Sequence, residues 1–199
     1  MEFLKGFITP WYESLENPVD AQQKVLTDLL EQYAKTEYGS TRGADKIHSP
    51  MDYRAQFPAI SYAGLCPYLE KVRTTDYRVI LPEPPLTWVM TRGSTGRAKV
   101  LPATKTHLEL ILLCGARAII NYAVRKNDAE ILTGKILNLN FPSVVSTLDS
   151  AGQTVTYGYS SGTYARLNPM LDKVSLLPRQ EDIDALGPGI TRNDWEKRF

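Results

Sequence analysis

The sequence predicts an α/β fold, with a helical lead-in followed by a mixed β-sheet with packed helices. Three observations support this class. Helix-start signals and helical spacing dominate the first third of the chain, prolines then interrupt that spacing, and short apolar or alternating segments typical of strands follow. With 199 residues, 43% of them hydrophobic and 23% charged, the chain can bury a core as one globular domain or a large part of one.

The N-terminal third is predicted to contain three helices. Residues 18–39 carry apolar side chains at helical spacing behind an Asn-Pro pair, which supplies a cap residue and a proline at the first helical position. A Ser-Pro pair repeats this start signal for a short helix over 51–56. Ser61 is the candidate cap of a third helix, whose apolar side includes Leu69 and Val72.

A buried strand is predicted next. The prolines at 82–85 cannot lie inside a helix, and the segment LTWVM (86–90) behind them has the size and the β-branched and aromatic content of a buried strand. We expect Trp88 and Met90 to be core residues of this strand rather than ligand contacts.

A long helix is predicted a short distance further on. Thr106 and Glu109 have the spacing of a capping box, and apolar positions continue to Val124. We expect this helix to be largely buried, so that the polar segment 91–99 lies between a strand and a helix.

The remaining segments predict further strands and a loop. KILNLNF (135–141) alternates Leu137, Leu139 and Phe141 with asparagines, which is typical of a half-buried strand. A turn rich in Asp, Ser and Gly precedes a β-branched run, and the stretch 157–169, rich in glycine, serine and tyrosine, is expected to be a loop.

The end of the sequence carries a further helix-start signal. Thr191 or Asn193 can cap a helix after a glycine and proline break, and the chain stops within about one turn of that start, too short for a helix that is stable by itself. We take this as a sign of truncation.

Charge and cysteine content argue against several classes of function. The 23 basic and 22 acidic residues are spread along the chain, so no strong field attracts nucleic acid or an anionic membrane. Cys66 and Cys114 lack metal-ligand spacing and are expected to be buried thiols in a reducing compartment. The N-terminus is a poor secretory signal, and the apolar window 108–124 is short for a bilayer span, so a cytoplasmic location is expected.

The segment TRGSTGRAK has the chemistry that polyphosphate binding requires. Glycines allow the backbone to approach a ligand, successive N–H groups can converge on an anion, hydroxyls add donors, and a lysine adds charge. The residues concerned are Thr91, Gly93, Ser94, Thr95, Gly96 and Lys99. The spacing fits neither the Walker A pattern nor the dinucleotide fingerprint, and from chemistry alone a phosphate-binding loop and a plain polar turn both remain open.

This segment also resembles the phosphate-binding motif of acyl-adenylate-forming enzymes, Ser/Thr-Ser/Thr-Gly-Ser/Thr-Thr-Gly-x-Pro-Lys. Two positions depart from it, because Arg92 replaces a small hydroxyl residue and Ala98 replaces the proline. Taken in order with LLEQYAKTEYG (29–39) and YRAQFPAISYAGLCPYLEKV (53–72), it is similar to the N-terminal part of the GH3 family, the auxin-responsive acyl-acid amido synthetases of plants and their prokaryotic relatives. The resemblance covers about residues 20–165.

The resemblance implies the N-terminal part of an adenylate-forming large domain. Residues 1–86 would be its mainly helical segment and 87–199 an α/β segment carrying the phosphate-binding loop, with the remainder of that domain and a C-terminal domain absent. It also implies ATP and Mg²⁺ as cofactors, and a small carboxylic acid and an amine such as an amino acid as substrates.

The implied reaction begins with attack of the acid's carboxylate on the α-phosphate of ATP. The acyl-adenylate then passes its acyl group to the amine or to another nucleophile. In this scheme Lys99 and the N–H groups at 93–96 hold the β- and γ-phosphates while pyrophosphate departs, and Thr91 lies nearest the α-phosphate and the acid. Lys99 is thus the candidate catalytic residue.

Arg117 is a candidate for the acid's carboxylate, because GH3 enzymes can use an arginine on the helix after the loop. The same residue fits a solvent-facing polar stripe with Glu109, Asn121 and Arg125, and both readings remain open.

The aromatic stretch and the histidines carry weaker signals. Tyr157, Tyr159, Ser161 and Tyr164 could line an acyl or nucleotide pocket or belong to a tight hairpin. His107 is expected in the first turn of a helix and His48 in a polar loop, and neither has a partner pattern that indicates catalysis or metal binding.

Three functional hypotheses follow. The leading one is participation in ATP-dependent activation of a carboxylic acid, in which the chain alone has little adenylating activity because the family's later Tyr/Ser-Glu motif and ribose-binding aspartate have no match here. The second is a non-catalytic remnant or split subunit that binds an anion or a protein partner, such as the missing C-terminal part. The third, a different phosphotransferase, is weaker because paired acidic metal ligands are not evident.

Overall fold

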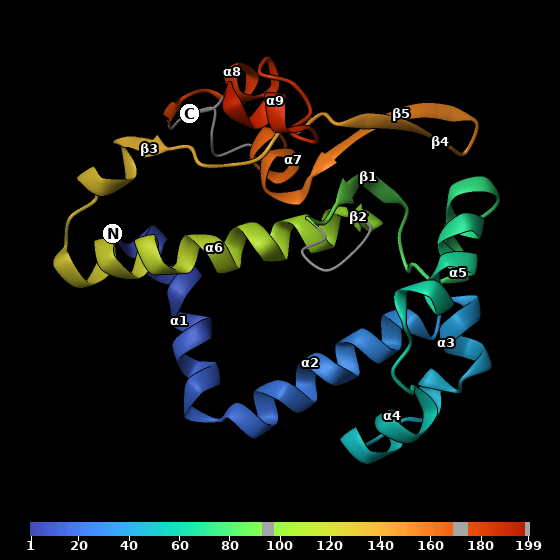
Figure 1. Ribbon diagram of the computed structural model, residues 1–199. Coiled ribbons are helices and arrows are strands. Elements are labelled where there is room, and N and C mark those ends of the chain that lie inside the picture. The colour runs from blue at the N-terminus through green and yellow to red at the C-terminus, as the bar shows by residue number, and fades with distance from the viewer. Residues whose placement is uncertain (93–97, 169–174, 198–199) are drawn as a thin grey trace. The chain divides into compact units, whose positions relative to one another are not determined.

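The computed structural model describes residues 1–92, 98–168 and 175–197, without the side chains of Arg192 and Trp195 (Figure 1). The chain divides into two compact units. The α/β unit comprises residues 1–8, 86–148 and 154–199, and the helical unit comprises 9–85 and 149–153.

The helical unit is a succession of helices joined by short connections. They are α1 (Glu2–Glu16), whose first turns belong to the α/β unit, α2 (Pro18–Tyr33), α3 (Glu37–Thr41), α4 (Pro50–Gln56) and α5 (Tyr62–Thr74), with 3₁₀ turns at Ala44–Lys46 and Tyr77–Val79. The three predicted N-terminal helices are confirmed as α2, α4 and α5.

Side-chain caps explain where these helices begin. The hydroxyls of Ser49 and Ser61 each accept a 3.1 Å hydrogen bond from a backbone N–H in the first turn of α4 and α5. The first predicted helix ends at Tyr33 instead of Gly39, because Thr36 caps a separate helix, α3, through a 3.0 Å bond from the Gly39 N–H. A Cβ at Gly39 would overlap the Tyr33 carbonyl, so only glycine fits this close approach.

The core of the helical unit is small. Leu30, Ala44 and Ile47 are buried together, and Leu26, Ala34 and Phe57 pack against them. This cluster fixes α2 against the first 3₁₀ turn and brings Phe57, at the end of α4, against the second half of α2.

The α/β unit is built on a mixed four-stranded sheet, ordered β2-β1-β5-β4. Its strands are β1 (Pro85–Met90), β2 (Val100–Thr104), β4 (Ser146–Ser150) and β5 (Gln153–Tyr159). β1 and β5 run parallel, with Trp88 opposite Tyr157 and Met90 opposite Tyr159. β4 and β5 form a hairpin whose turn residues, Ala151 and Gly152, both have positive φ (51° and 75°), as a type I′ turn requires.

A second, two-stranded parallel sheet pairs β3 (Lys135–Leu137) with β6 (Ser175–Leu177). The helices of this unit are α6 (Lys105–Lys126), α7 (Ser160–Arg166), α8 (Gln180–Asp184) and α9 (Arg192–Glu196), with a 3₁₀ turn at Glu130–Leu132. The α/β class with a mixed sheet is thus confirmed, and β1 is the predicted buried strand, with Trp88 and Met90 both in its core.

The start of the long helix was predicted two residues too late. Thr104, the last residue of β2, caps α6 by accepting a 3.3 Å hydrogen bond from the His107 N–H, so Thr106 is already inside the first turn and makes no capping box. Sequence reasoning did not predict β2 as a separate strand, because its five residues include a proline and follow the polar segment directly.

The expectation that this helix is largely buried is wrong. Leu108, Ile120 and Ala123 are buried, whereas Leu110 is 55% and Tyr122 45% exposed, because the neighbouring segments of the α/β unit cover only one side of α6. Among the described residues, α6 is the helix that is long and apolar enough to cross a membrane by length and composition, with 17% of its most apolar window buried.

In the alternating segment 135–141, the buried and exposed sides are the opposite of those predicted. Asn138 is buried, while Leu137 and Leu139 are 71% and 78% exposed. The Asn138 side chain donates to Gln180 Oε1 at 3.4 Å and accepts the Asn140 N–H at 3.1 Å. These polar contacts turn the asparagine inward and end β3 at Leu137, before the alternation is complete.

Two further expectations are corrected. Residues 157–166, expected to be a loop, are not one: β5 continues to Tyr159 and α7 follows at once, because the aromatic residues pack in the sheet and the small residues allow close helix packing. The last residue of the predicted loop, Pro169, lies outside the described residues. Cys66 and Cys114 are both exposed, each on a helix face that its own unit leaves uncovered.

Candidate functional site

The ends of the predicted phosphate-binding loop meet at the edge of the sheet. The Thr91 N–H donates a 2.8 Å hydrogen bond to the Lys99 carbonyl, and the Lys99 N–H donates to Thr91 Oγ1 at 3.3 Å. We call this pair the neck. The structure therefore brings Thr91 and Lys99 together directly behind the buried end of β1, with Lys99 exposed. Gly93, Ser94, Thr95 and Gly96 lie outside the described residues.

Arg92, the residue after the neck threonine, lies on an aromatic ring. Its guanidinium carbon is 4.6 Å from the centroid of the Phe141 ring, and that ring is 5.3 Å from the ring of Tyr159 at the end of β5. A cation over an aromatic face at this distance is attracted by the ring quadrupole. The side chain that departs from the family motif thus has a defined partner.

The backbone N–H and the carbonyl of Phe141 are both hydrogen-bonded. Its N–H donates to Ser161 Oγ on α7 at 3.1 Å, and its carbonyl accepts a 3.0 Å bond from Gln180 Nε2 on α8. Gln180 is buried, so these bonds are shielded from water. We refer to Phe141 with Tyr159, Ser161 and Gln180 as the Phe141 platform.

The two residues after Phe141 extend this attachment. Ser143, fully buried, donates from its N–H (2.6 Å) and from its hydroxyl (2.5 Å) to the two carboxylate oxygens of Asp184. A Cβ at Gly158 would overlap the Ser143 carbonyl, and a Cβ at Gly162 would overlap that of Phe141. The backbone of 141–143 therefore lies directly against β5 and α7, and glycine is what allows this approach.

A second polar pair joins α6 to α7. His107 Nε2 and the Tyr164 hydroxyl are 3.0 Å apart, and their rings meet edge to face with centroids 5.9 Å apart. Burial raises the pKa of the Tyr164 hydroxyl. His107 lies in the first turn of α6 as predicted. The pairing with Tyr164 was missed, since 57 residues separate the two and neither has a local motif.

The other aromatic-stretch residues have packing roles. Tyr157 lies opposite Trp88 in the sheet, Tyr159 is buried with its hydroxyl donating to the Gly189 carbonyl at 3.3 Å, and Ser161 holds the Phe141 N–H. Tyr157 and Tyr159 belong to the second strand of the β4–β5 hairpin, and Ser161 lies at the start of α7.

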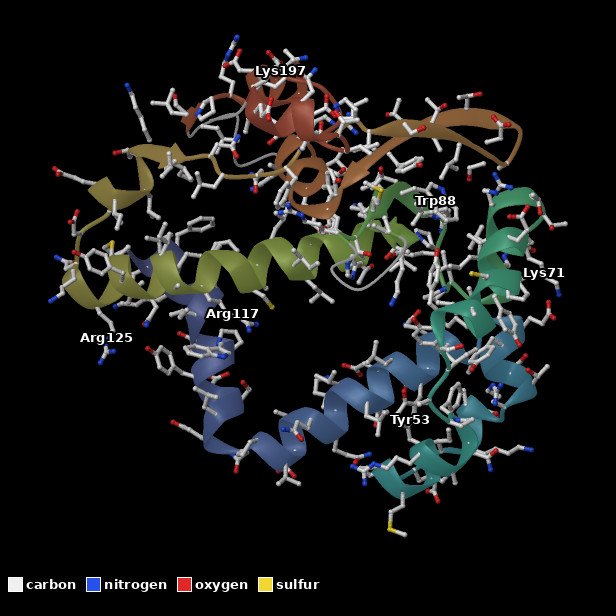
Figure 2. All side chains as sticks on the ribbon, in the orientation of Figure 1. Tyr53, Lys71, Trp88, Arg117, Arg125 and Lys197 are labelled. Carbon is white, nitrogen blue, oxygen red and sulfur yellow. The ribbon has the colours of Figure 1, made fainter. Side chains whose placement is uncertain are left out.

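Arg117 lies in the middle of α6 and is half-buried (Figure 2). On the preceding part of the helix, the exposed Glu109 pairs with Lys105 at 3.7 Å. The role of Arg117 toward an acid remains a prediction. No group of three or more His, Cys, Asp or Glu side chains suited to a metal ion occurs within 1–92, 98–168 and 175–197.

Sequence comparison relates this chain to amido synthetases. Indole-3-acetic acid-amido synthetase GH3.8 of Oryza sativa subsp. indica is 31% identical over 100 residues, which cover 49% of this chain and 16% of that protein. Indole-3-acetic acid-amido synthetase GH3.2 of Arabidopsis thaliana is 27% identical over 99 residues, covering 49% of this chain and 18% of that protein.

Comparison with solved structures gives a match that covers more of this chain. The AtGH3.15 acyl acid amido synthetase solved in complex with 2,4-DB has a TM-score of 0.70 at 17% identity, over 92% of this chain and 32% of that chain. At this identity the likeness shows the fold alone. The chain thus spans about a third of the solved relative.

The family model extends over most of the sequence. The GH3 family N-terminal domain matches residues 9–182, a range that includes the neck, Arg92 and the Phe141 platform. The motif order, the fold and this match agree, and the chain belongs to the GH3 family.

Proposed function

We propose that this chain is the N-terminal portion of an ATP-dependent acyl-adenylating enzyme, which activates a carboxylic acid as acyl-AMP for transfer to an amine such as an amino acid. The neck is the observation that carries the proposal, since it holds Thr91 and Lys99 at the two ends of a segment with the composition of a nucleotide loop. The relatives' names, which are those of amido synthetases, support the same reaction class.

Each neck residue has a role that its geometry supports. Lys99 extends an exposed ammonium that can neutralise the β- and γ-phosphates as pyrophosphate leaves. Thr91 Oγ1 accepts the Lys99 N–H and still has a proton to donate to the α-phosphate or to the acid's carboxylate. The N–H groups at 93–96 would complete the cradle, and ATP supplies the phosphoryl group that the acid attacks.

This chain gives less support for Mg²⁺ than for ATP. The family resemblance implies Mg²⁺, yet the described ranges hold no cluster of acidic or histidine ligands for it. We therefore assign no step through the metal to the described residues.

The proposal includes partners and location. A small carboxylic acid and an amine are the substrates, Arg117 is the candidate partner of the acid, and the remaining part of the enzyme completes the site. The near balance of charge, a net +1, supports an absence of nucleic-acid and membrane binding. The N-terminus, a poor secretory signal, supports a cytoplasmic location.

A second candidate function is favoured by one observation. Leu137 and Leu139 are mostly exposed beside the short β3–β6 sheet, as expected of a surface used in protein contact. A non-catalytic remnant or split subunit that binds an anion or a protein partner would have such a surface without adenylating activity.

The test is acid-dependent exchange of labelled pyrophosphate into ATP by the protein expressed from its complete gene. We expect exchange in the presence of a suitable carboxylic acid, and a loss of at least about tenfold in Lys99→Ala, the size expected when a charged partner of a phosphate is removed. Lys126→Ala, an exposed lysine at the far end of α6, is the matched control and should retain full activity. An absence of exchange with a broad panel of acids would support the remnant instead.

A further inference from the structure

We propose that Arg92 is a positioning residue for the nucleotide loop: its stack on Phe141 fixes the start of the loop to the Phe141 platform. This inference rests on the proposed function, because it assigns a role within the same site. It also gives a physical role to the one charged residue at which this chain departs from the family's hydroxyl pattern.

The contacts form a closed circuit around the end of β1. Met90 is paired with Tyr159 in the sheet, the Tyr159 ring packs against Phe141, and the Phe141 ring carries the guanidinium of Arg92. Thr91 lies between Met90 and Arg92 and is tied to Lys99 at 2.8 Å. The chain leaving β1 is therefore held by the sheet, by the neck and by the stack within three consecutive residues.

The Phe141 platform is a rigid attachment point. Both backbone groups of Phe141 are hydrogen-bonded, to Ser161 at 3.1 Å and to Gln180 at 3.0 Å, and the following Pro142 and Ser143 are fully buried. Since the ring is already ordered by these contacts, the stack costs mainly the side-chain entropy of Arg92. A contact to such a ring restrains Arg92 more than a contact to a mobile side chain would.

The family motif places a small hydroxyl residue where Arg92 stands, and such a side chain is too short to lie over the Phe141 ring. The arginine therefore replaces a local donor by a tether to a neighbouring segment. A tether of this kind affects how well the site is positioned to bind ATP. We therefore expect it to change the KM for ATP and not the rate of the chemical step.

The experiment measures steady-state kinetics of the protein expressed from its complete gene, with Arg92→Ser, Phe141→Leu and the double variant. An exposed cation–π contact of this type corresponds to roughly a two- to fivefold effect. We expect each single variant to raise the KM for ATP by about that factor, with kcat and the KM for the acid changed by less than about twofold. The double variant should raise the KM for ATP no further than the larger of the two single effects. Arg92→Lys, which keeps a cation over the ring, should restore most of the wild-type KM.

Arg78→Ser is the matched control. Arg78 also lies over an aromatic ring, that of Tyr77 at 5.4 Å, but it belongs to the helical unit and should leave the KM for ATP unchanged. Thermal denaturation of each variant separates a folding defect, which lowers the active fraction and hence kcat, from a positioning defect.

Two outcomes overturn the inference and one overturns the proposed function. If Phe141→Leu leaves the KM for ATP unchanged while Arg92→Ser raises it, the guanidinium contacts the ligand and the tether is wrong. If the two single effects multiply in the double variant, the residues act independently and the tether is again wrong. If the wild-type protein shows no acid-dependent exchange, the proposed function itself fails.

Discussion

The amide of Thr91 donates to the carbonyl of Lys99 across 2.8 Å, and the amide of Lys99 returns a bond to the Thr91 hydroxyl. Two residues that the sequence separates by seven others are thus joined by reciprocal bonds at the end of a buried strand. The arrangement places the backbone of Lys99 and the hydroxyl of Thr91 at one point of the sheet.

Thr91→Val should weaken the neck without changing its volume. Valine keeps the shape of threonine but can neither accept the Lys99 N–H nor donate to a phosphate, and a lost hydrogen bond of this kind is worth about 0.5–1.5 kcal/mol. We expect kcat/KM in pyrophosphate exchange to fall by roughly threefold to tenfold. Thr91→Ser, which keeps the hydroxyl, should stay near the wild-type value, and equal losses in both variants would contradict the role of the hydroxyl.

Gly162→Ala should destabilise the α/β unit, because the new methyl group would overlap the Phe141 carbonyl. Overpacking of this type costs about 1–3 kcal/mol, measurable as a lower midpoint in urea unfolding. Gly115→Ala is the matched control, since nothing lies within 4 Å of the added Cβ in the middle of α6. Its expected effect has the opposite sign, a gain of roughly 0.5–1 kcal/mol from helix propensity.

Ser143→Ala should cost about 1–3 kcal/mol in the free energy of unfolding. The hydroxyl donates to Asp184 in a buried position, and its loss leaves a carboxylate oxygen with one fewer donor. Ser40→Ala, at an exposed hydroxyl that donates to a backbone carbonyl in its own helix, should cost much less. Similar losses for the two would show that the Asp184 contact is not a main stabilising feature.

Thr104→Ala should destabilise α6 by about 1 kcal/mol, the usual cost of removing an N-cap hydroxyl. Thr106→Ala should have a smaller effect, because Thr106 lies inside the first turn. Urea unfolding followed by circular dichroism compares the two directly, and the reverse order would place the cap at Thr106 after all.

Asp194 should make the protein more stable above its titration range than below it. Its carboxylate accepts the backbone N–H groups of Thr191 and Ile190 at 3.0 and 3.1 Å, and the Thr191 bond above all lowers the pKa of Asp194 in the folded protein. A lowered folded pKa gives stabilisation that is complete above the unfolded value, about 4, and is lost as pH falls through the folded value. Unfolding temperatures recorded between about pH 6 and pH 2 should therefore fall less steeply for Asp194→Asn than for the wild type.

Local signals account for the parts of the fold that sequence reasoning predicted. Ser49 and Ser61 cap the helices expected behind them. The LTWVM segment is a buried strand because burial removes its large apolar side chains from water. Thr91 and Lys99 were candidates from the sequence, since their side-chain chemistry and the family motif point to the same positions, and their role toward phosphate stays a prediction.

Long-range contacts account for what was missed. Asn138 is buried through Gln180, Phe141 is fixed by Ser161 and Gln180, and His107 meets Tyr164, in each case with a partner 20 to 57 residues away. An alternating pattern predicts that a strand has an apolar and a polar face. It does not predict that a polar side chain will be buried by hydrogen bonds to a residue far away in the sequence. The contact between Arg92 and Phe141 was likewise not predictable, because the two residues are not adjacent in the sequence.

Leu137 and Leu139 also bear on how this protein behaves in concentrated solution. The two leucines are 71% and 78% exposed, and the chain carries a net charge of +1 with an isoelectric point near 7.7. Close to that pH there is almost no charge repulsion between molecules to oppose contact through apolar side chains. Buffer pH, more than salt, is therefore the first variable that determines how concentrated this protein can be kept.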